Sequence, residues 1–224
     1  MTSHPGQYTV LNSEDPEVQR LAAVELEVQA ELMDGMGLGP SRWWSCTSAA
    51  PRAGSIRARP LRAGLERLSA AARARVGIEN DDRSFGLADV LRLSERIERP
   101  VVCDVLHHHC HDPHGIDDRE ALELALATWP AGVTPKIQYS TPKTAVEERR
   151  RRVWRRVERT LVLPQLRAHA DTIDPIAFRQ FLGVAADLEF DVMLEAKAKD
   201  LALLRLREQL AISVPAGPSP RARA

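Results

Sequence analysis

The chain has no net charge and few cysteines, and each shortage argues against one class of protein. Lysine plus arginine equal aspartate plus glutamate, 31 against 31, so no whole-protein field indicates a nucleic-acid partner, and any such surface needs local clustering. The three cysteines, Cys46, Cys103 and Cys110, are odd in number and irregularly spaced. This spacing argues against a disulfide framework and favours a reducing cytoplasm.

Signals for membranes and secretion are absent from the sequence as well. No apolar run approaches the length of about 18 residues that a membrane span needs. The amino terminus lacks the basic-then-apolar pattern of a secretion signal. We therefore expect no membrane partner.

What remains is typical of a folded domain. The 224 residues are 44% hydrophobic and 28% charged, which is enough for one large domain or two small ones. Only four of the basic residues are lysine and the other 27 are arginine, and together with the abundant alanine this indicates a GC-rich gene.

A histidine-rich stretch at 100–115, PVVCDVLHHHCHDPHG, is the most informative segment. Five of the seven histidines fall within eight residues, 107–114. Asp104 and His107 form an Asp-x-x-His pair directly after a short apolar run. Carboxylate and imidazole together suit divalent metals such as Mn²⁺, Zn²⁺ or Fe²⁺. The alternative is a histidine-rich surface loop without a metal.

Strand-like and helix-like segments alternate along the chain, which is typical of a parallel α/β architecture. Strands are expected at 75–78, 100–104, 134–139 and 190–194. Helices are expected from Asp15-Pro16 to Gly35 or Gly37, at 61–74, from Ser84 through Ile97, from Asp117, at 145–160, from Pro175, and at 196–210. The segment 41–60 fits neither period, and the tail 213–224 is expected to be disordered.

Potential ligands follow successive predicted strands. They are His4, Glu79, Asp104, His107, Gln138 and Glu195. In a β/α barrel the carboxyl ends of the strands converge on one centre. We therefore predict an incomplete TIM (β/α) barrel over 1–212, with about six strands and its active face at these ends.

With these residues in view, the chain resembles the UV damage endonuclease family. The motifs that carry the resemblance are SHPGQYTVLNSEDPEV (3–18), VGIENDDRSF (76–85), PVVCDVLHHHC (100–110), TPKIQYSTPK (134–143), HADTIDP (169–175) and FDVMLEAKAKDLALLRL (190–206). The resemblance implies nicking of double-stranded DNA 5′ of UV photoproducts, with divalent metals, most often Mn²⁺.

The resemblance also assigns roles to residues. Its metal-ligand positions correspond to His4, Glu79, Asp104, His107, His169 and Glu195, with Glu79 bridging two metals. It places Lys136 beside the metals as a catalytic candidate. It gives Gln7 and Tyr8 the role of probing the duplex at the lesion, which suits an aromatic and an amide on one loop. His108, His109 and Gln138 are candidates for the surroundings of the ligands.

Three departures from the family pattern bear on activity. The family carries further barrel strands before the segment at which this chain starts. Gln138 stands where the family motif KIHYS has a histidine ligand. The family strand VVVLHVGG, which holds another histidine, is replaced by WWSCTSAA at 43–50. A one-base shift of GC-rich codons converts the first into the second, so we hypothesise that about 43–60 are translated out of frame.

Three functions follow from this reading. The first is a monomeric DNA repair endonuclease that uses divalent metal to activate water. The second is a catalytically inactive, truncated remnant, and the third is a metal-dependent sugar isomerase on a similar barrel. A basic helix at 149–159 either tracks the phosphate backbone or is a solvated face paired with Glu147, Glu148 and Glu158.

Overall fold

The structure, a computed structural model, describes residues 5, 9–39, 44–47, 58–154 and 156–212. The chain divides into two compact units. The first is Met1–Tyr139 with Asp187–Met193, and the second is Ser140–Ala186 with Leu194–Ala224. A single partial barrel over 1–212 stays a prediction.

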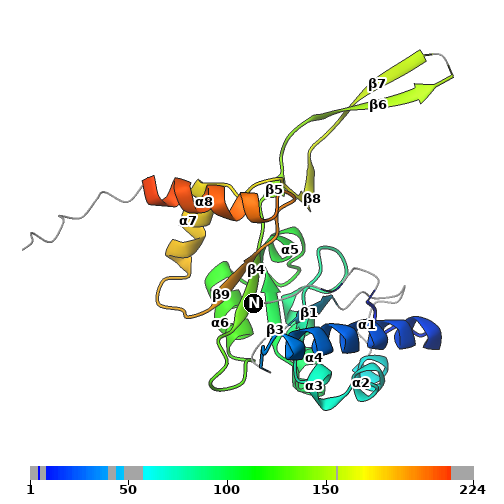
Figure 1. Ribbon diagram of the computed structural model, residues 1–224. Helices are drawn as coiled ribbons and strands as arrows, with labels where there is room; N and C mark the ends of the chain where they lie inside the picture. Colours follow the sequence, from blue (N-terminus) through cyan, green and yellow to red (C-terminus); the bar gives the residue numbers. More distant parts are fainter. Residues whose placement is uncertain (1–4, 6–8, 40–43, 48–57, 155, 213–224) are drawn as a thin grey trace, which may run out of the picture. The chain divides into compact units, whose positions relative to one another are not determined.

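The main sheet has five strands among the described residues, in the order β1-β2-β3-β4-β9 (Figure 1). These strands are β1 (Trp44–Thr47), β2 (Val76–Glu79), β3 (Val101–Asp104), β4 (Lys136–Tyr139) and β9 (Asp191–Leu194). The pairs β1–β2, β2–β3 and β3–β4 are parallel. Every residue of β2, β3 and β4 is buried, as expected of parallel strands covered on both faces. The predicted α/β fold with a parallel sheet is confirmed.

One helix of the first unit precedes β1 in sequence, and the others lie between its strands. They are α1 (Pro16–Gly35), α2 (Ala58–Glu66), α3 (Ala70–Arg73), α4 (Leu87–Ile97), α5 (Val105–Cys110) and α6 (Asp118–Leu126). Side-chain caps set several of their starts, because the first N–H groups of a helix have no partner within it. Asp15 accepts from Glu17 N at α1, Ser69 from Ala72 N at α3, and Asp117 from Glu120 N at α6.

Two helix predictions need correction in detail. The single helix expected at 61–74 is broken into α2 and α3, because Ser69 caps a new helix start. The helix over α1 was indicated by an apolar row of Val18, Leu21, Val24, Val28 and Leu32. In the structure Val18 is half-buried and the other four are exposed. The helix instead buries a row that includes Ala22, Leu26, Ala30 and Met33.

The second unit contains two small antiparallel sheets and two helices. The elements are β5 (Pro142–Lys143), β6 (Glu147–Val153), β7 (Arg156–Val162), β8 (Gln165–His169), α7 (Pro175–Val184) and α8 (Asp200–Ile212). Strand β5 pairs with β8, and β6 pairs with β7. The two helices contact each other, with Phe178 and Phe181 buried on α7 and Ala202 and Leu206 buried on α8.

The basic helix predicted at 145–160 is wrong, because these residues form the β6–β7 hairpin. In a helix, like-charged residues three and four apart share a face, so Arg149 would lie beside Arg152, and Arg152 beside Arg156. In a strand, successive side chains point to opposite faces, so the four consecutive arginines are divided between the two sides. The hairpin is almost entirely exposed, so no buried face favours a helix.

Among the residues that the structure describes, no helix combines the length and apolar character needed to cross a bilayer.

Candidate metal centre

Two neighbouring strands of the first unit each end in a buried carboxylate. Glu79 is the last residue of β2, and Asp104 is the last residue of β3. Since β2 and β3 are parallel, their carboxyl ends lie at the same edge of the sheet. Both side chains are buried, in a position where unpaired charge is costly and a cation or a proton is favoured.

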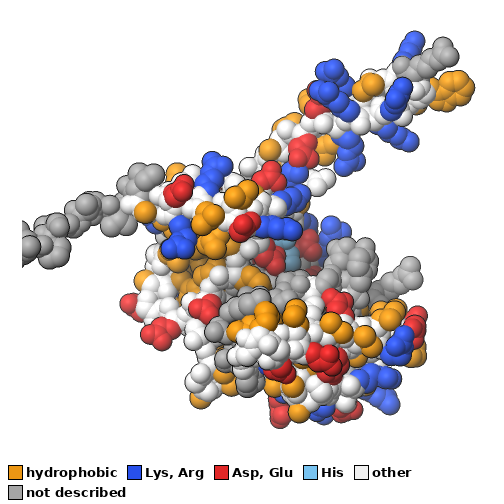
Figure 2. Space-filling view, in the orientation of Figure 1, with side chains coloured by type: hydrophobic (Ala, Val, Ile, Leu, Met, Phe, Trp, Pro, Cys, Tyr) orange, Lys and Arg blue, Asp and Glu red, His pale blue; other side chains and the backbone are white. Residues whose placement is uncertain are grey.

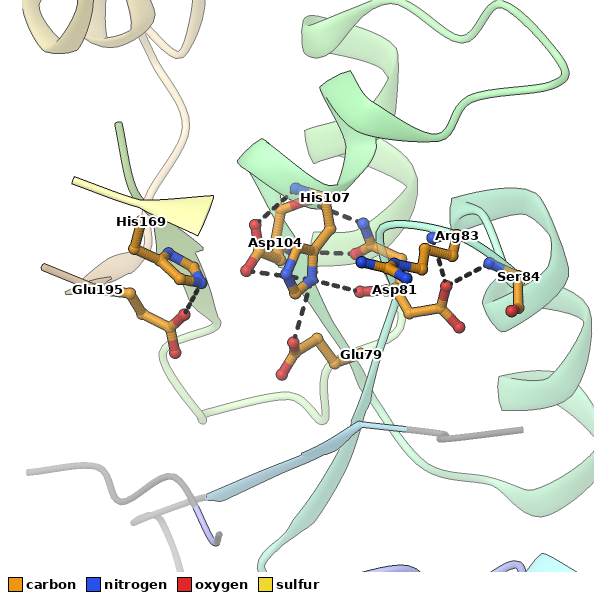
Figure 3. A network of polar contacts seen from close by, with 9 residues as sticks. Glu79, Asp81, Arg83, Ser84, Asp104, His107, His169 and Glu195 are labelled. Atoms are coloured by element: carbon orange, nitrogen blue, oxygen red, sulfur yellow. Dashed lines mark hydrogen bonds and ion pairs between the residues drawn. The ribbon is translucent and has the colours of Figure 1, made fainter. Parts of the chain in front are cut away.

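The Asp-x-x-His spacing turns the side chain of His107 toward these two carboxylates. Asp104 is the N-cap of α5, and its Oδ1 accepts a hydrogen bond of 2.9 Å from His107 N. The imidazole Nδ1 of His107 then lies 3.3 Å from Asp104 Oδ2 and 3.4 Å from Glu79 Oε1. Figure 3 shows the three side chains converging from β2, β3 and α5. We call Glu79, Asp104 and His107 the triad.

Asn80 braces the triad, and sequence reasoning missed this role. Its Nδ2 donates to Asp104 O and its Oδ1 accepts from Asp104 N, both at 2.9 Å. Its own carbonyl oxygen lies 3.0 Å from His107 Nδ1. The only signal in the sequence is a polar residue directly after a strand. The bonds themselves join residues 24 positions apart, which no local pattern encodes.

The charge state of His107 reflects its surroundings. Burial disfavours the charged imidazole, but the hydrogen bond to Glu79 and the charges of Asp104 and Glu79 outweigh burial and raise the pKa of His107 to about 10. At neutral pH a proton on His107 therefore balances part of the carboxylate charge. A divalent cation at this position would take over that role, and metal binding would release the proton.

The triad fits a divalent metal ion by the chemistry of its donors. One ligand atom from each of Glu79, Asp104 and His107 lies within 4.8 Å of the others. Two carboxylate oxygens and an imidazole nitrogen suit borderline divalent ions. These three residues were all predicted as ligands, and the structure brings them together.

The two other histidines singled out beside His107 have partners on the following loop and helix. His108 Nε2 lies 2.8 Å from Ile116 O, and His109 Nε2 lies 2.8 Å from Asp118 Oδ1. The hydrogen bond to Asp118, opposed by burial, raises the pKa of His109. The first contact ties α5 to the loop before α6, and the second ties it to the first residue of α6, so both hold the helix that carries His107 in place.

The second unit contains another predicted pair. His169 ends β8, Glu195 directly follows β9, and His169 Nε2 lies 3.6 Å from Glu195 Oε2. A backbone bond from Lys197 N to Ala170 O ties the segments that carry them. Figure 3 shows the contact. The structure thus brings these two predicted ligands together, and their role as ligands stays a prediction.

Two predicted residues lie on β4. Gln138 is fully buried and is the register partner of Asp104 on the adjacent strand, which places it at the carboxyl end of the sheet. Lys136 lies at the start of β4, where Nζ pairs with Asp191 Oδ2 at 2.5 Å and donates to Thr134 O at 2.6 Å. These contacts give Lys136 a structural partner, and its catalytic role stays a prediction.

Several predictions fall outside the described residues. They concern the ligand His4 and the lesion-probing residues Gln7 and Tyr8. Most of the segment proposed to be out of frame lies there too. Within it, the backbone of Trp44–Thr47 does form strand β1, paired with β2 in register from Trp44↔Val76 to Thr47↔Glu79.

The fold and the triad define an α/β protein with a candidate divalent-metal centre at the carboxyl edge of a parallel sheet. Comparison with known families shows which family of α/β proteins the chain belongs to. The family model UV-endonuclease UvdE matches residues 1–216, so the chain belongs to this family.

Individual relatives agree with this assignment. The chain is 27% identical over 214 residues to a UV DNA damage endonuclease of Bacillus cereus (strain Q1), covering 92% of this chain and 61% of the relative. A relative of the same name from Bacillus anthracis shows the same identity and coverage. The chain thus spans about three fifths of the length of these curated relatives.

Solved structures show a similar fold. SacUVDE matches with a TM-score of 0.74 and 30% identity, covering 94% of this chain and 65% of that chain. Endonuclease IV from Thermus thermophilus matches with a TM-score of 0.56 at 12% identity, covering 95% of this chain and 76% of that chain, which indicates a shared fold alone. The resemblance to the UV damage endonuclease family is confirmed.

Proposed function

We propose that this chain carries the metal centre of a DNA repair endonuclease that nicks double-stranded DNA 5′ of UV photoproducts. Membership of the UvdE family supports the reaction class. The triad at the strand ends is the observation that carries the proposal, because buried carboxylates beside an imidazole provide the ligands that metal-assisted hydrolysis requires.

In this proposal, the side chains of the protein bind the metal ion and position the phosphate, and none of them attacks phosphorus. Glu79, Asp104 and His107 would hold a cation, and His4, His169 and Glu195 remain proposed metal ligands. A bound divalent ion, which we propose to be Mn²⁺, supplies Lewis-acid polarisation of the phosphate and lowers the pKa of water. Water attacks phosphorus, the bond from phosphorus to the 3′ oxygen breaks, and that oxygen takes up a proton. No side chain acts as nucleophile.

Lesion recognition is assigned to the amino-terminal segment. Gln7 and Tyr8 would occupy the space left when a damaged dinucleotide leaves the stack, where an aromatic ring replaces lost stacking. Lys136 is proposed to act beside the centre, and this role requires it to exchange its contact with Asp191 for one with a ligand or the phosphate.

The experiment is nicking of UV-irradiated supercoiled plasmid by the purified chain with Mn²⁺. We expect nicked circles above the level of an unirradiated control and none after chelation with EDTA. Glu79→Gln should abolish nicking, because the neutral amide is a weaker ligand at a buried position. Glu95→Gln, an exposed change on α4, is the matched control and should leave nicking unchanged.

The alternative is an inactive remnant. One observation favours it: Gln138 stands where the family motif has an imidazole, and a neutral amide is a weaker metal ligand. An absence of nicking by wild-type protein that is folded and binds Mn²⁺ would support the remnant and contradict the endonuclease.

A further inference from the structure

The β6–β7 hairpin is an exposed two-stranded ribbon. Its strands pair continuously from Glu147↔Val162 to Val153↔Arg156, and in the ribbon view it extends away from α7 and α8 of the same unit (Figure 1). All residues of β6 and nearly all of β7 are exposed. A hairpin without a core is only marginally stable in water. Its exposed side chains therefore do little to stabilise the fold, and a role in stability does not account for their charge.

Positive charge is concentrated on this ribbon. Its two strands contain six arginines and three glutamates, and Figure 2 shows Lys and Arg side chains along it. The register places Arg150 directly opposite Arg159, a like-charge pair that destabilises a hairpin. Both contact Glu148 Oε1, at 2.7 Å and 3.7 Å. One carboxylate thus serves two guanidinium groups, and an external polyanion would relieve their repulsion.

The tip of the hairpin carries an exposed tryptophan in an unfavourable backbone conformation. Trp154 is 94% exposed, and its φ is 56°. A left-handed backbone is unfavourable for a bulky residue, and two-residue hairpin turns favour Asn or Gly at such positions. An unfavourable backbone and an exposed ring at the end of a basic arm together point to contact with a partner.

Double-stranded DNA fits these features better than a membrane surface does. The cations described on the two strands are all arginine, whose planar guanidinium binds phosphate oxygens in pairs. A two-stranded ribbon has the width that the major groove admits. Trp154 offers a flat ring for stacking on a base or sugar.

We propose that the β6–β7 hairpin is a DNA-binding arm, whose arginines contact backbone phosphates and whose Trp154 stacks on the nucleic acid. The inference rests on the proposed function only in taking DNA as the polyanion. It assigns binding to the arm, separately from cleavage at the metal centre.

The test measures binding of the full chain to a labelled duplex by fluorescence anisotropy in EDTA, so that cleavage is silent. The hairpin variant is Arg150→Gln/Arg152→Gln/Arg159→Gln. The control variant removes three exposed charges elsewhere in the same unit: Arg179→Gln/Arg205→Gln/Arg207→Gln.

We expect the hairpin variant to bind at least about tenfold more weakly at 0.1 M salt, with its salt slope smaller by about 2–3. The control should stay within about twofold of wild type. Trp154→Ala should lose roughly 5- to 100-fold in affinity while keeping the salt slope, because stacking is not ionic. Unchanged thermal melting verifies that each variant is folded.

Three results would overturn the inference. They are no measurable binding by wild type, equal losses in the hairpin and control variants, and unchanged DNA affinity accompanied by lost binding to anionic phosphatidylserine vesicles. Failure of the proposed function gives a different result, in which wild type binds the duplex through the arm but does not nick irradiated plasmid with Mn²⁺.

Discussion

At the scale of single residues, the candidate centre depends on short-range contacts within the Asp104–His107 turn and on long-range hydrogen bonds from Asn80. The Asp104 cap and the placement of His107 follow from the Asp-x-x-His spacing, which is visible in sequence. Glu79 was predictable as the residue that ends an apolar strand. Asn80 was not, because its bonds reach from the end of β2 to the backbone of Asp104 on the neighbouring strand β3.

Replacing Asn80 by alanine should therefore destabilise the protein and loosen the centre. The change leaves the buried N–H and C=O of Asp104 without these partners, at a cost of about 1–3 kcal/mol. Urea denaturation measures the free energy of unfolding. Gln180→Ala, which removes an exposed amide on α7, should change it by less than about 0.5 kcal/mol. Equal effects of the two changes would contradict the bracing role.

The thiols give a second test at this scale. Cys103 is buried in β3, and burial together with the neighbouring Asp104 charge raises its pKa. Because the thiolate is the reactive form, Cys103 should resist iodoacetamide at pH 8 in the native protein, whereas half-buried Cys110 should react faster than Cys103. Peptide mass spectrometry reports both rates. Equal alkylation rates of Cys103 and Cys110 in the native protein would contradict the burial of β3.

At the scale of elements, the strands of the main sheet at β2, β3, β4 and β9 were predictable and the exposed hairpin strands were not. The four predicted strands lie within two residues of these elements, because segments too short for a helix that contain Val, Ile, Phe or Tyr are typical of strands. The hairpin of β6 and β7 was mistaken for a helix. Its residues have no buried face, so hydrophobic periodicity carried little information about which structure they adopt.

One helix contact at this scale is specific enough to test by substitution. Gly64 is buried in α2, and a Cβ there would overlap the backbone carbonyl of Leu11. Gly64→Ala should destabilise the protein by about 1–3 kcal/mol through overpacking, although alanine is the better helix former.

Gly183 on α7 is the matched control, because nothing lies within 4 Å of a Cβ at that position. Gly183→Ala should be neutral or stabilising by up to about 1 kcal/mol. Thermal denaturation of both variants decides the matter, and a stabilised Gly64→Ala protein would show that α2 does not pack closely on the Leu11 segment.

At the scale of the whole molecule, the sequence predicted the class of fold and the edge at which the triad forms. Successive strands that each end in a potential ligand indicated a shared centre, and Glu79, Asp104 and His107 do converge. Membership of the UvdE family supports the reaction class that we propose. Sequence could not predict how charge is distributed on the hairpin, because that depends on strand pairing between residues as far apart as Glu147 and Val162.

The central claim is that the triad holds a divalent cation. Calorimetric titration of the purified, metal-free chain with Mn²⁺ tests it most directly, alongside Glu79→Gln and the exposed control Glu95→Gln. The account predicts saturable binding by wild type and the control, and an affinity at least about tenfold lower for Glu79→Gln. Equal Mn²⁺ affinity for all three proteins, or no binding by wild type, would contradict it.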